Sequence, residues 1–316
     1  MPLNDTTIDV QHLGREAYVA VEVLATAAGP VLLDTGPGST LDTLKAGLTA
    51  LGLGVGDLHA ILLSHIHLDH AGATGLLVAE NPRITVYVHE IGAVHLIDPS
   101  RLVKSATRIY GDNMDRFWGK FLPVPAANVR EIRDGERLDI GGRRFEVAYT
   151  PGHAVHHVSY FDPANRTAYV GDTGGIRVPS LPITLPVTPP PDFSLEQWLE
   201  SIGKILAWKP ARLFSTHFGY RDDPAVQLED LRRGLVEWSQ LAQRLLATGQ
   251  SNEACAAAFN TTVMAWLADR GEAAAITEFA NFSDFRASFN GIARYWKEKT
   301  APPRSTTSGT DPGRTA

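Results

Sequence analysis

Histidine residues are concentrated in two short stretches of this sequence. The chain holds 11 histidines, and six of them lie at positions 65, 67, 70, 153, 156 and 157. The first stretch, residues 65–70, reads His-x-His-x-Asp-His. Imidazole and carboxylate groups suit zinc, iron or manganese better than a soft copper site. Four potential ligands within these six residues therefore predict a metal-binding site.

The segment before the first stretch indicates how its side chains are positioned. Residues 60–64 form an apolar run ending at Ser64, which is typical of a strand in a sheet covered on both faces. In an extended segment residues i and i+2 face the same way, so His65 and His67 can hold one ion together. Asp69 and His70 follow where the chain is expected to turn into a helix, and they can hold a second ion.

Strand and helix patterns alternate up to about residue 220. Apolar and β-branched runs predict strands over residues 17–25, 30–34, 84–88, 158–161, 167–170 and 211–215. Residues 129–149 are predicted to form further strands, separated by turns at Asp134-Gly135 and Gly141-Gly142. Helical spacing predicts helices over residues 40–51 and 194–207, capped by Ser39 and Ser194, and a further helix over 73–80. Proline argues against regular structure in residues 178–192. Residues 98–123 fit either short helices that cover a cleft or an ordinary pair of core helices.

Three regions follow from these patterns. Residues 1–223 are predicted to form one mixed α/β domain, and residues 224–300 a helical C-terminal extension, because only helical spacing is seen there. Residues 301–316 are rich in Pro, Ser, Thr and Gly and are predicted to be a disordered tail.

The composition excludes several classes of protein. Hydrophobic residues make up 44% of the 316 residues and charged residues 20%, as in a soluble globular chain. The net charge of −6 argues against a protein that binds nucleic acid. The single cysteine, Cys255, can form neither an internal disulfide nor a thiolate metal site alone, and it is interpreted as a core residue. Neither a membrane span nor a secretory signal is visible, so a cytoplasmic location is expected.

Five motifs in a fixed order carry a family resemblance. They are the 65–70 stretch, Asp34-Thr35-Gly36, Pro151-Gly152-His153, Gly171-Asp172-Thr173 and Ser215-Thr216-His217-Phe218-Gly219. In these motifs the chain resembles the metallo-β-lactamase fold superfamily of hydrolases, over about residues 8–220. The resemblance implies a four-layer αβ/βα sandwich, in which two packed mixed sheets carry helices on their outer faces and the site lies at one edge of the sheets. The C-terminal helices would be an extension of this α/β fold.

The resemblance also implies a role for each motif residue. The first metal ion would be bound by His65, His67 and His153, and the second by Asp69, His70 and His217. Asp172 would bridge the two ions, whereas Asp34 would support the site without being a ligand. A bridging hydroxide at neutral pH would then attack the substrate, and the ions would stabilise the oxyanion. Zinc is the expected metal, with iron or manganese as alternatives.

Two residues differ from those usually found in particular branches of the superfamily, and these differences argue against the reactions of those branches. Asp172 argues against antibiotic hydrolysis, because true β-lactamases of this fold usually have Cys or Ser near that position. His67 argues against the flavin-linked di-iron branch, which usually has Glu there. The expected function is therefore hydrolysis of an ester, thioester or lactone, similar to glyoxalase II-type thioesterases and lactonases. A mononuclear iron sulfur dioxygenase, a phosphodiesterase and a non-catalytic metal-binding protein are the alternatives.

Further residues are predicted to handle substrate. Asp69, Asp172 and His157 are the expected catalytic residues; either His156 or His157 could orient substrate or donate a proton. Tyr110, Phe117 and Trp118 are expected to form one wall of an acyl or aromatic pocket. The other histidines are interpreted as non-functional: His12, His59, His89 and His95. The expected partner is a small acyl substrate, without nucleic acid or membrane, and the aromatic-rich C-terminal helices favour a homodimer.

Overall fold

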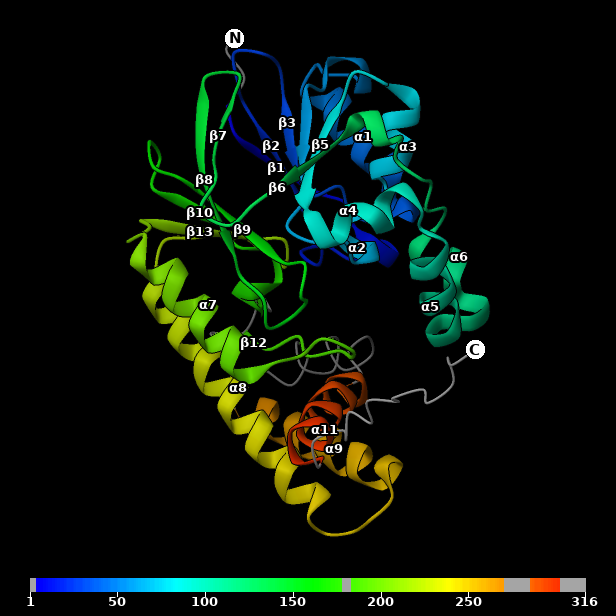
Figure 1. Cartoon of the computed structure of the whole chain (residues 1–316), viewed down its shortest axis with the longest axis vertical. Coiled ribbons are helices and arrows are strands. Elements are labelled where there is room, and N and C mark those ends of the chain that lie inside the picture. Colours follow the sequence, from blue (N-terminus) through cyan, green and yellow to red (C-terminus); the bar gives the residue numbers. More distant parts are fainter. Residues whose placement is uncertain (1–3, 178–182, 270–284, 302–316) are drawn as a thin grey trace, which may run out of the picture.

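The computed structural model describes residues 4–177, 183–269 and 285–301. The tail predicted to be disordered, residues 301–316, lies outside these ranges except for its first residue. Two sheets face each other in the upper part of the molecule, and long helices extend below them (Figure 1). None of the helices within the described ranges combines the length and apolar character needed to cross a membrane.

The first sheet contains six strands in the order of the sequence. They are β1 (Thr6–Asp9), β2 (Ala20–Leu24), β3 (Val31–Leu33), β4 (Ala60–Leu62), β5 (Thr85–His89) and β6 (Val129–Ile132). The pairs β1–β2 and β2–β3 are antiparallel, whereas β3 to β6 run parallel. On β2, Val21 and Val23 pack on one face and Ala20 and Leu24 on the other, as the period of two in this predicted strand requires.

The second sheet also contains six strands. In spatial order they are β14 (Gly219–Arg221), β13 (Arg212–Ser215), β10 (Thr167–Tyr169), β9 (Val158–Asp162), β8 (Arg143–Tyr149) and β7 (Arg137–Ile140). Only the β10–β13 pair is parallel. This sheet is therefore mixed, like the first.

Helices cover the outer face of each sheet. Those beside the first sheet are α1 (Leu41–Ala50), α2 (Leu68–Ala71), α3 (Thr74–Glu80) and α4 (Glu90–Ile97). Farther out along the same side lie α5 (Ser100–Tyr110) and α6 (Met114–Trp118) (Figure 1). The second sheet is covered by α7 (Leu195–Ala207) and α8 (Pro224–Leu246).

Three clusters of buried apolar side chains fill the spaces between these layers. One joins the first sheet to its helices, for example Ile61 to Leu48. The second lies between the sheets and includes Leu62 and Phe214. The third joins the second sheet to α7 and α8. The order helix, sheet, sheet, helix is the four-layer sandwich that was predicted.

The C-terminal helices belong to the third cluster. Helices α9 (Asn252–Ala268) and α11 (Arg286–Thr300) pack on α8, and Phe259 and Phe289 are fully buried in the same cluster as Leu213 of the second sheet. The predicted boundary at residue 223 falls directly before α8, but apolar packing is continuous across it. Cys255 is buried in this cluster, as its interpretation as a core residue required.

Local details differ from the sequence predictions at several places. Ser194 occupies the N-cap position of α7 as predicted, but its side chain makes no cap hydrogen bond. Ser39 does not cap α1; its Oγ donates to the carbonyl oxygen of Phe117 at 2.7 Å, and Thr40 occupies the cap position without a side-chain hydrogen bond. Residues 178–192 contain a short strand, β12 (Thr184–Leu185), which pairs with β11 (Ile176–Arg177). The strand predicted over 211–215 is followed by β14, which the sequence analysis missed.

Candidate metal centre

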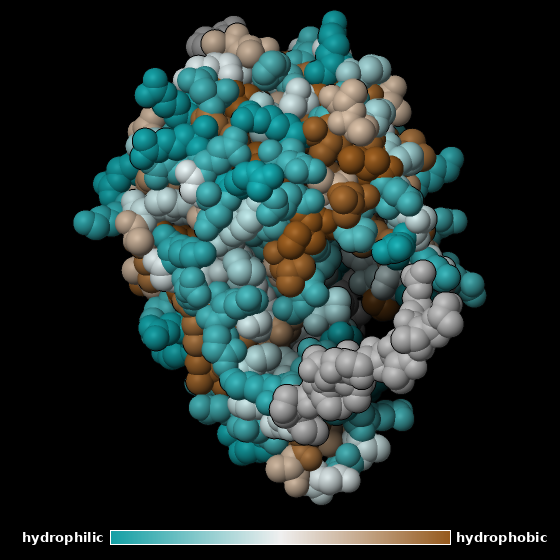
Figure 2. Space-filling model, viewed as in Figure 1, coloured by the Kyte–Doolittle hydropathy of each residue, from teal (hydrophilic) through white to brown (hydrophobic). Residues whose placement is uncertain are grey.

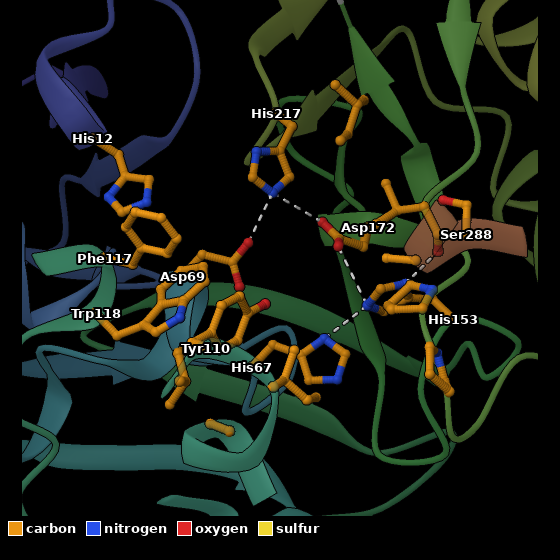
Figure 3. Close-up of a pocket in the computed structure, with 18 of the residues that line it drawn as sticks. His12, His67, Asp69, Tyr110, Phe117, Trp118, His153, Asp172, His217 and Ser288 are labelled. Atoms are coloured by element: carbon orange, nitrogen blue, oxygen red, sulfur yellow. Dashed lines mark hydrogen bonds and ion pairs between the residues drawn. The ribbon is translucent and has the colours of Figure 1, made fainter. Parts of the chain in front are cut away.

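The candidate ligands follow four strands that end at the same edge of the two sheets. His65, His67, Asp69 and His70 come after β4, and His153 comes after β8. Asp172 lies in the 3₁₀ helix η6 (Gly171–Gly174) after β10, and His217 follows β13. Packed strands can present loop side chains rigidly, which explains how residues far apart in the sequence meet here (Figure 3).

Three histidines form the first group. Nδ1 of His67 lies 2.9 Å from Nε2 of His65 and 2.8 Å from Nε2 of His153. One ligand nitrogen from each of the three residues lies within 4.8 Å of those from the other two. These are the residues that the family resemblance assigned to the first ion.

Asp69, His70 and His217 form the second group, again with their ligand atoms within 4.8 Å of one another. Nε2 of His217 lies 3.3 Å from Oδ2 of Asp69. Nε2 of His70 lies 3.8 Å from the same oxygen.

Asp172 stands between the two groups. Its Oδ2 lies 3.3 Å from Nε2 of His153 in the first group. Its Oδ1 lies 3.1 Å from Nε2 of His70 and 3.5 Å from Nε2 of His217 in the second group. The two oxygens of one carboxylate therefore point to different groups, as a bridging ligand requires.

Hydrogen bonds behind the site orient three of the imidazole rings. Nδ1 of His70 donates to Asp34 at 2.7 Å, Nδ1 of His153 to the carbonyl oxygen of Val187 at 2.7 Å, and Nδ1 of His217 to the carbonyl oxygen of Tyr18 at 2.7 Å. With the proton on Nδ1, the lone pair of each Nε2 faces the other candidate ligands.

Asp34 takes the supporting position that the resemblance implied. It is fully buried at the end of β3 and also accepts hydrogen bonds from the amide and Oγ of Ser64 and from Oγ1 of Thr216, all at 2.8 Å. One carboxylate therefore ties together the segments that carry His65, His70 and His217.

The electrostatics of the site favour a cation. Burial, together with the neighbouring His153, lowers the pKa of His67 to about 3, which keeps this imidazole neutral. Burial opposes a charge on His70, yet the carboxylates of Asp172 and Asp69 hold the pKa of His70 well above its usual value. Burial also opposes ionisation of Asp172, but His70 and His153 hold its pKa well below the ordinary range. The neutral His67 and the ionised Asp172 are already in the forms that bind metal ions, and His70 would release a proton when an ion binds.

The residues present fit a metal pair. Nε2 of His70 and Oδ1 of Asp172 are buried, but within the part of the chain that the structure describes neither has a hydrogen-bond partner of good geometry. Buried polar atoms are normally paired, so two that face each other without a bond point to an ion between them. Five imidazoles and two carboxylates are also the donor types that zinc, iron and manganese accept.

A cavity of about 650 Å³ opens above this centre. His67, Asp69, His153, Asp172 and His217 line it, whereas His65 and His70 are fully buried behind them. The predicted wall residues line it as well: Tyr110, Phe117 and Trp118. Segment 98–123 therefore covers a cleft with short helices, which is the first of its two interpretations.

His157, which was predicted to be catalytic, lies away from this cavity. It is fully buried and is not part of the described lining. Its Nε2 accepts a hydrogen bond from the amide of Asp172 at 3.1 Å, and its Nδ1 lies 2.9 Å from Oγ1 of Thr150. This position suits a residue that orients Asp172, rather than one that exchanges a proton with substrate.

Among the lining residues that sequence reasoning did not single out for the site are His12 and Tyr18. His12 was interpreted as non-functional, but it is buried, and its ring stacks on Trp118 with centroids 5.3 Å apart. Burial lowers the pKa of His12 to about 4. No local pattern marked this histidine, because its neighbour lies more than a hundred positions away in the sequence.

Comparison with known proteins agrees with this geometry. Residues 16–217 match the family model described as the Metallo-beta-lactamase superfamily. A metallo-beta-lactamase fold-containing protein of Sulfurisphaera tokodaii is 29% identical over 181 residues, which cover 56% of this chain and 67% of that protein. A hydroxyacylglutathione hydrolase of Synechococcus is 31% identical over 117 residues, but these cover only 37% of this chain and 35% of that enzyme.

A solved structure extends the likeness to almost the whole chain. A metallo-beta-lactamase family protein of Thermus thermophilus superposes with a TM-score of 0.68, covering 94% of both chains at 21% identity, which supports the fold alone. The family match, in contrast, spans the four strand ends that carry the candidate ligands. The chain belongs to the metallo-beta-lactamase superfamily of metal-dependent hydrolases.

Proposed function

We propose that this protein hydrolyses an ester, thioester or lactone with the help of two divalent metal ions. The observation that carries the proposal is the position of Asp172, whose two carboxylate oxygens face two separate groups of candidate ligands at the floor of a cavity. The similarity to a hydroxyacylglutathione hydrolase over about a third of each chain supports hydrolysis at a carbonyl group.

Seven side chains would hold the two ions. His65, His67 and His153 would bind one ion, while Asp69, His70 and His217 would bind the other, with Asp172 shared. Zinc is the proposed metal, and iron or manganese would accept the same donors. When bound, such ions lower the pKa of water towards about 7 and polarise a carbonyl oxygen.

Two residues of the chain itself would assist the reaction, Asp69 by acting on a water molecule and His157 by orienting Asp172. Asp69 lines the cavity with about a quarter of its side chain exposed (23%), so its carboxylate can accept a hydrogen bond from a water molecule above the centre and orient it. His157 would hold Asp172 in its bridging orientation through the Asp172 amide. Hydrolysis adds water across the acyl bond, and the leaving oxygen or sulfur takes up the proton.

Metal analysis combined with a substrate panel tests this function. The purified protein should contain two ions per chain and hydrolyse a thioester, an aryl ester or an acyl homoserine lactone, with activity lost on chelation and restored by zinc. Asp172→Ala should lose bound metal and at least about a thousandfold in kcat/KM. Full activity of the chelated protein or of Asp172→Ala would overturn the proposal.

The same panel separates the alternatives. A phosphodiester as the preferred substrate would favour a phosphodiesterase. Oxygen uptake with glutathione persulfide and one iron per chain would favour the dioxygenase, which needs only one of the two ligand groups. A metal-loaded protein without turnover on any of these compounds would favour a non-catalytic metal-binding protein.

A further inference from the structure

The candidate ligands form the floor of the cavity, and its two side walls come from parts of the fold that supply no candidate ligands. Helices α5 and α6 form one side of it, together with His12 and Tyr18. The other side is formed by residues 185–191 and by the start of α11, including Ser288. Figure 2 shows the molecule hollowed between its upper and lower parts, and Figure 3 shows the two sides facing each other across Asp69 and Asp172.

The first side is an aromatic wall, which we define as His12, Tyr18, Tyr110, Phe117 and Trp118. The ring of His12 stacks between Tyr18, at 5.9 Å, and Trp118, at 5.3 Å. Tyr110 meets Trp118 edge to face at 5.1 Å. Each ring supports its neighbour, so the wall presents a large apolar surface with little freedom to rearrange.

The opposite side is also apolar. The described lining residues on this side come from β11, residues 185–191 and the start of α11. They are Ile176, Leu185, Pro186, Val187, Pro189, Pro190, Pro191, Phe285 and Ala287, with Ser288 as the only polar one among them. Two apolar walls facing each other bury most of a ligand's surface and favour an apolar ligand.

The cavity carries little positive charge. Among the described lining residues Arg116 is the only arginine or lysine, and its side chain is exposed at the rim. A glutathione thioester brings two carboxylates and one ammonium group, which need charged partners when they leave water. The two carboxylates of the floor, Asp69 and Asp172, would be occupied by metal ions. The described walls therefore offer one cation for two anionic groups.

The aromatic wall contains two polar atoms that the fold leaves unused. Nε1 of Trp118 and Nδ1 of His12 are buried and have no hydrogen-bond partner among the described residues. An indole N–H can only donate, so Trp118 lacks an acceptor. An uncharged oxygen of a ligand against this wall would supply that acceptor, whereas a purely hydrocarbon surface would not.

We propose that the substrate is an uncharged ester or thioester with a large apolar acyl group, which packs against the aromatic wall, and is not a glutathione thioester. This inference rests on the proposed hydrolase function and names the substrate class of the same site. The acyl carbonyl would lie at the floor near Asp69, where its oxygen would accept a hydrogen bond from Nε1 of Trp118. The apolar chain would extend between the wall and residues 185–191.

Kinetics with matched substrates test the inference. The zinc-loaded protein should show a kcat/KM for p-nitrophenyl decanoate at least about tenfold above those for p-nitrophenyl acetate and S-lactoylglutathione. Trp118→Ala should reduce kcat/KM for the decanoate at least about tenfold, mainly through KM, and that for the acetate less than about threefold. A preference for S-lactoylglutathione, or an equal loss on both aryl esters, would overturn the inference.

Binding separates this inference from the hydrolase proposal. Methyl nonyl ketone has the chain and carbonyl of the decanoate but no leaving group, and S-nonylglutathione has the same chain on the tripeptide. Calorimetry on the zinc-loaded protein should show tighter binding of the ketone, weakened at least about tenfold in Trp118→Ala. Such binding of the ketone without turnover of any ester would overturn the hydrolase proposal but not the proposed ligand class. Turnover of both aryl esters without binding of the ketone would overturn the proposed substrate class but not the hydrolase proposal.

Two control variants define what Trp118 contributes. Val94→Ala alters an exposed apolar residue on α4 that does not line the cavity, so it should leave ketone binding and ester kinetics unchanged. Trp118→Phe keeps an aromatic ring but removes the N–H donor. It should retain more ketone affinity than Trp118→Ala, and an affinity no better than that of the alanine variant would exclude packing as the contribution.

Discussion

Gln227 of α8 donates through Nε2 to the carbonyl oxygen of Gly174, at 2.9 Å. The same nitrogen donates to Oγ of Ser215 at 3.2 Å. Gly174 ends the 3₁₀ helix that carries Asp172, and Ser215 ends the strand before His217. One buried amide of the C-terminal helical region therefore links two segments that carry candidate ligands.

Gln227→Ala should weaken metal binding without unfolding the protein. The two ligand segments lose their common donor, so the positions of Asp172 and His217 become less fixed, and we expect about a tenfold loss in zinc affinity. Competition with a chromophoric chelator measures this affinity. Gln243→Ala, an exposed glutamine on the same helix, is the matched control. Equal zinc affinities in the two variants would contradict the role of Gln227.

Asp34→Ala should reduce both stability and metal content. It leaves the hydroxyl groups of Ser64 and Thr216 and Nδ1 of His70 without their buried acceptor. We expect the free energy of unfolding to fall by about 3 kcal/mol or more, measured by denaturant titration. Asp42→Ala, at an exposed position in α1, should cost less than about 1 kcal/mol. Comparable losses of unfolding free energy in both variants would contradict a particular contribution of the buried Asp34 carboxylate to stability.

Glu22 should make stability depend on pH. It is fully buried on β2, where it accepts hydrogen bonds from Thr7 and Tyr220, and burial raises its pKa from 4.5 to about 7. Between these values the folded protein keeps a proton that the unfolded chain releases. The free energy of unfolding should therefore fall as pH rises from about 4.5 to 7, by up to about 3 kcal/mol from this group.

Glu22→Gln removes this titration, so the difference in unfolding free energy between wild type and variant should change across the same pH range. Denaturant titrations at several pH values measure it, and other titrating groups cancel in the difference. Glu253→Gln, at an exposed position of α9, is the control and should show no such change. A pH-independent difference for Glu22→Gln would contradict a raised pKa.

Chelation should lower the melting temperature but leave the fold intact. The three apolar clusters contain none of the candidate ligands, so secondary structure measured by circular dichroism should persist without metal. Free zinc at about a thousand times its dissociation constant would add about 4 kcal/mol to the free energy of unfolding. Identical melting curves with zinc and with chelator would show that the described centre does not bind the ion.

The sequence predicted the strands that carry the candidate ligands because each is an apolar run that stops directly before a polar motif. It missed β14, since three residues are too few to show alternation. It also missed the place of His12 and assigned Ser39 to a helix cap, although both residues contact segment 98–123 instead. Contacts between distant segments depend on how layers pack, and no local pattern records them.

The aromatic wall belongs to helices α5 and α6 and the segment 12–18, whereas the candidate ligands sit at the ends of β4, β8, β10 and β13. In the proposed enzyme, substrate recognition and hydrolysis would therefore depend on different segments of the chain. Laboratory evolution confined to residues 100–118 should then change substrate selectivity without changing the candidate metal ligands.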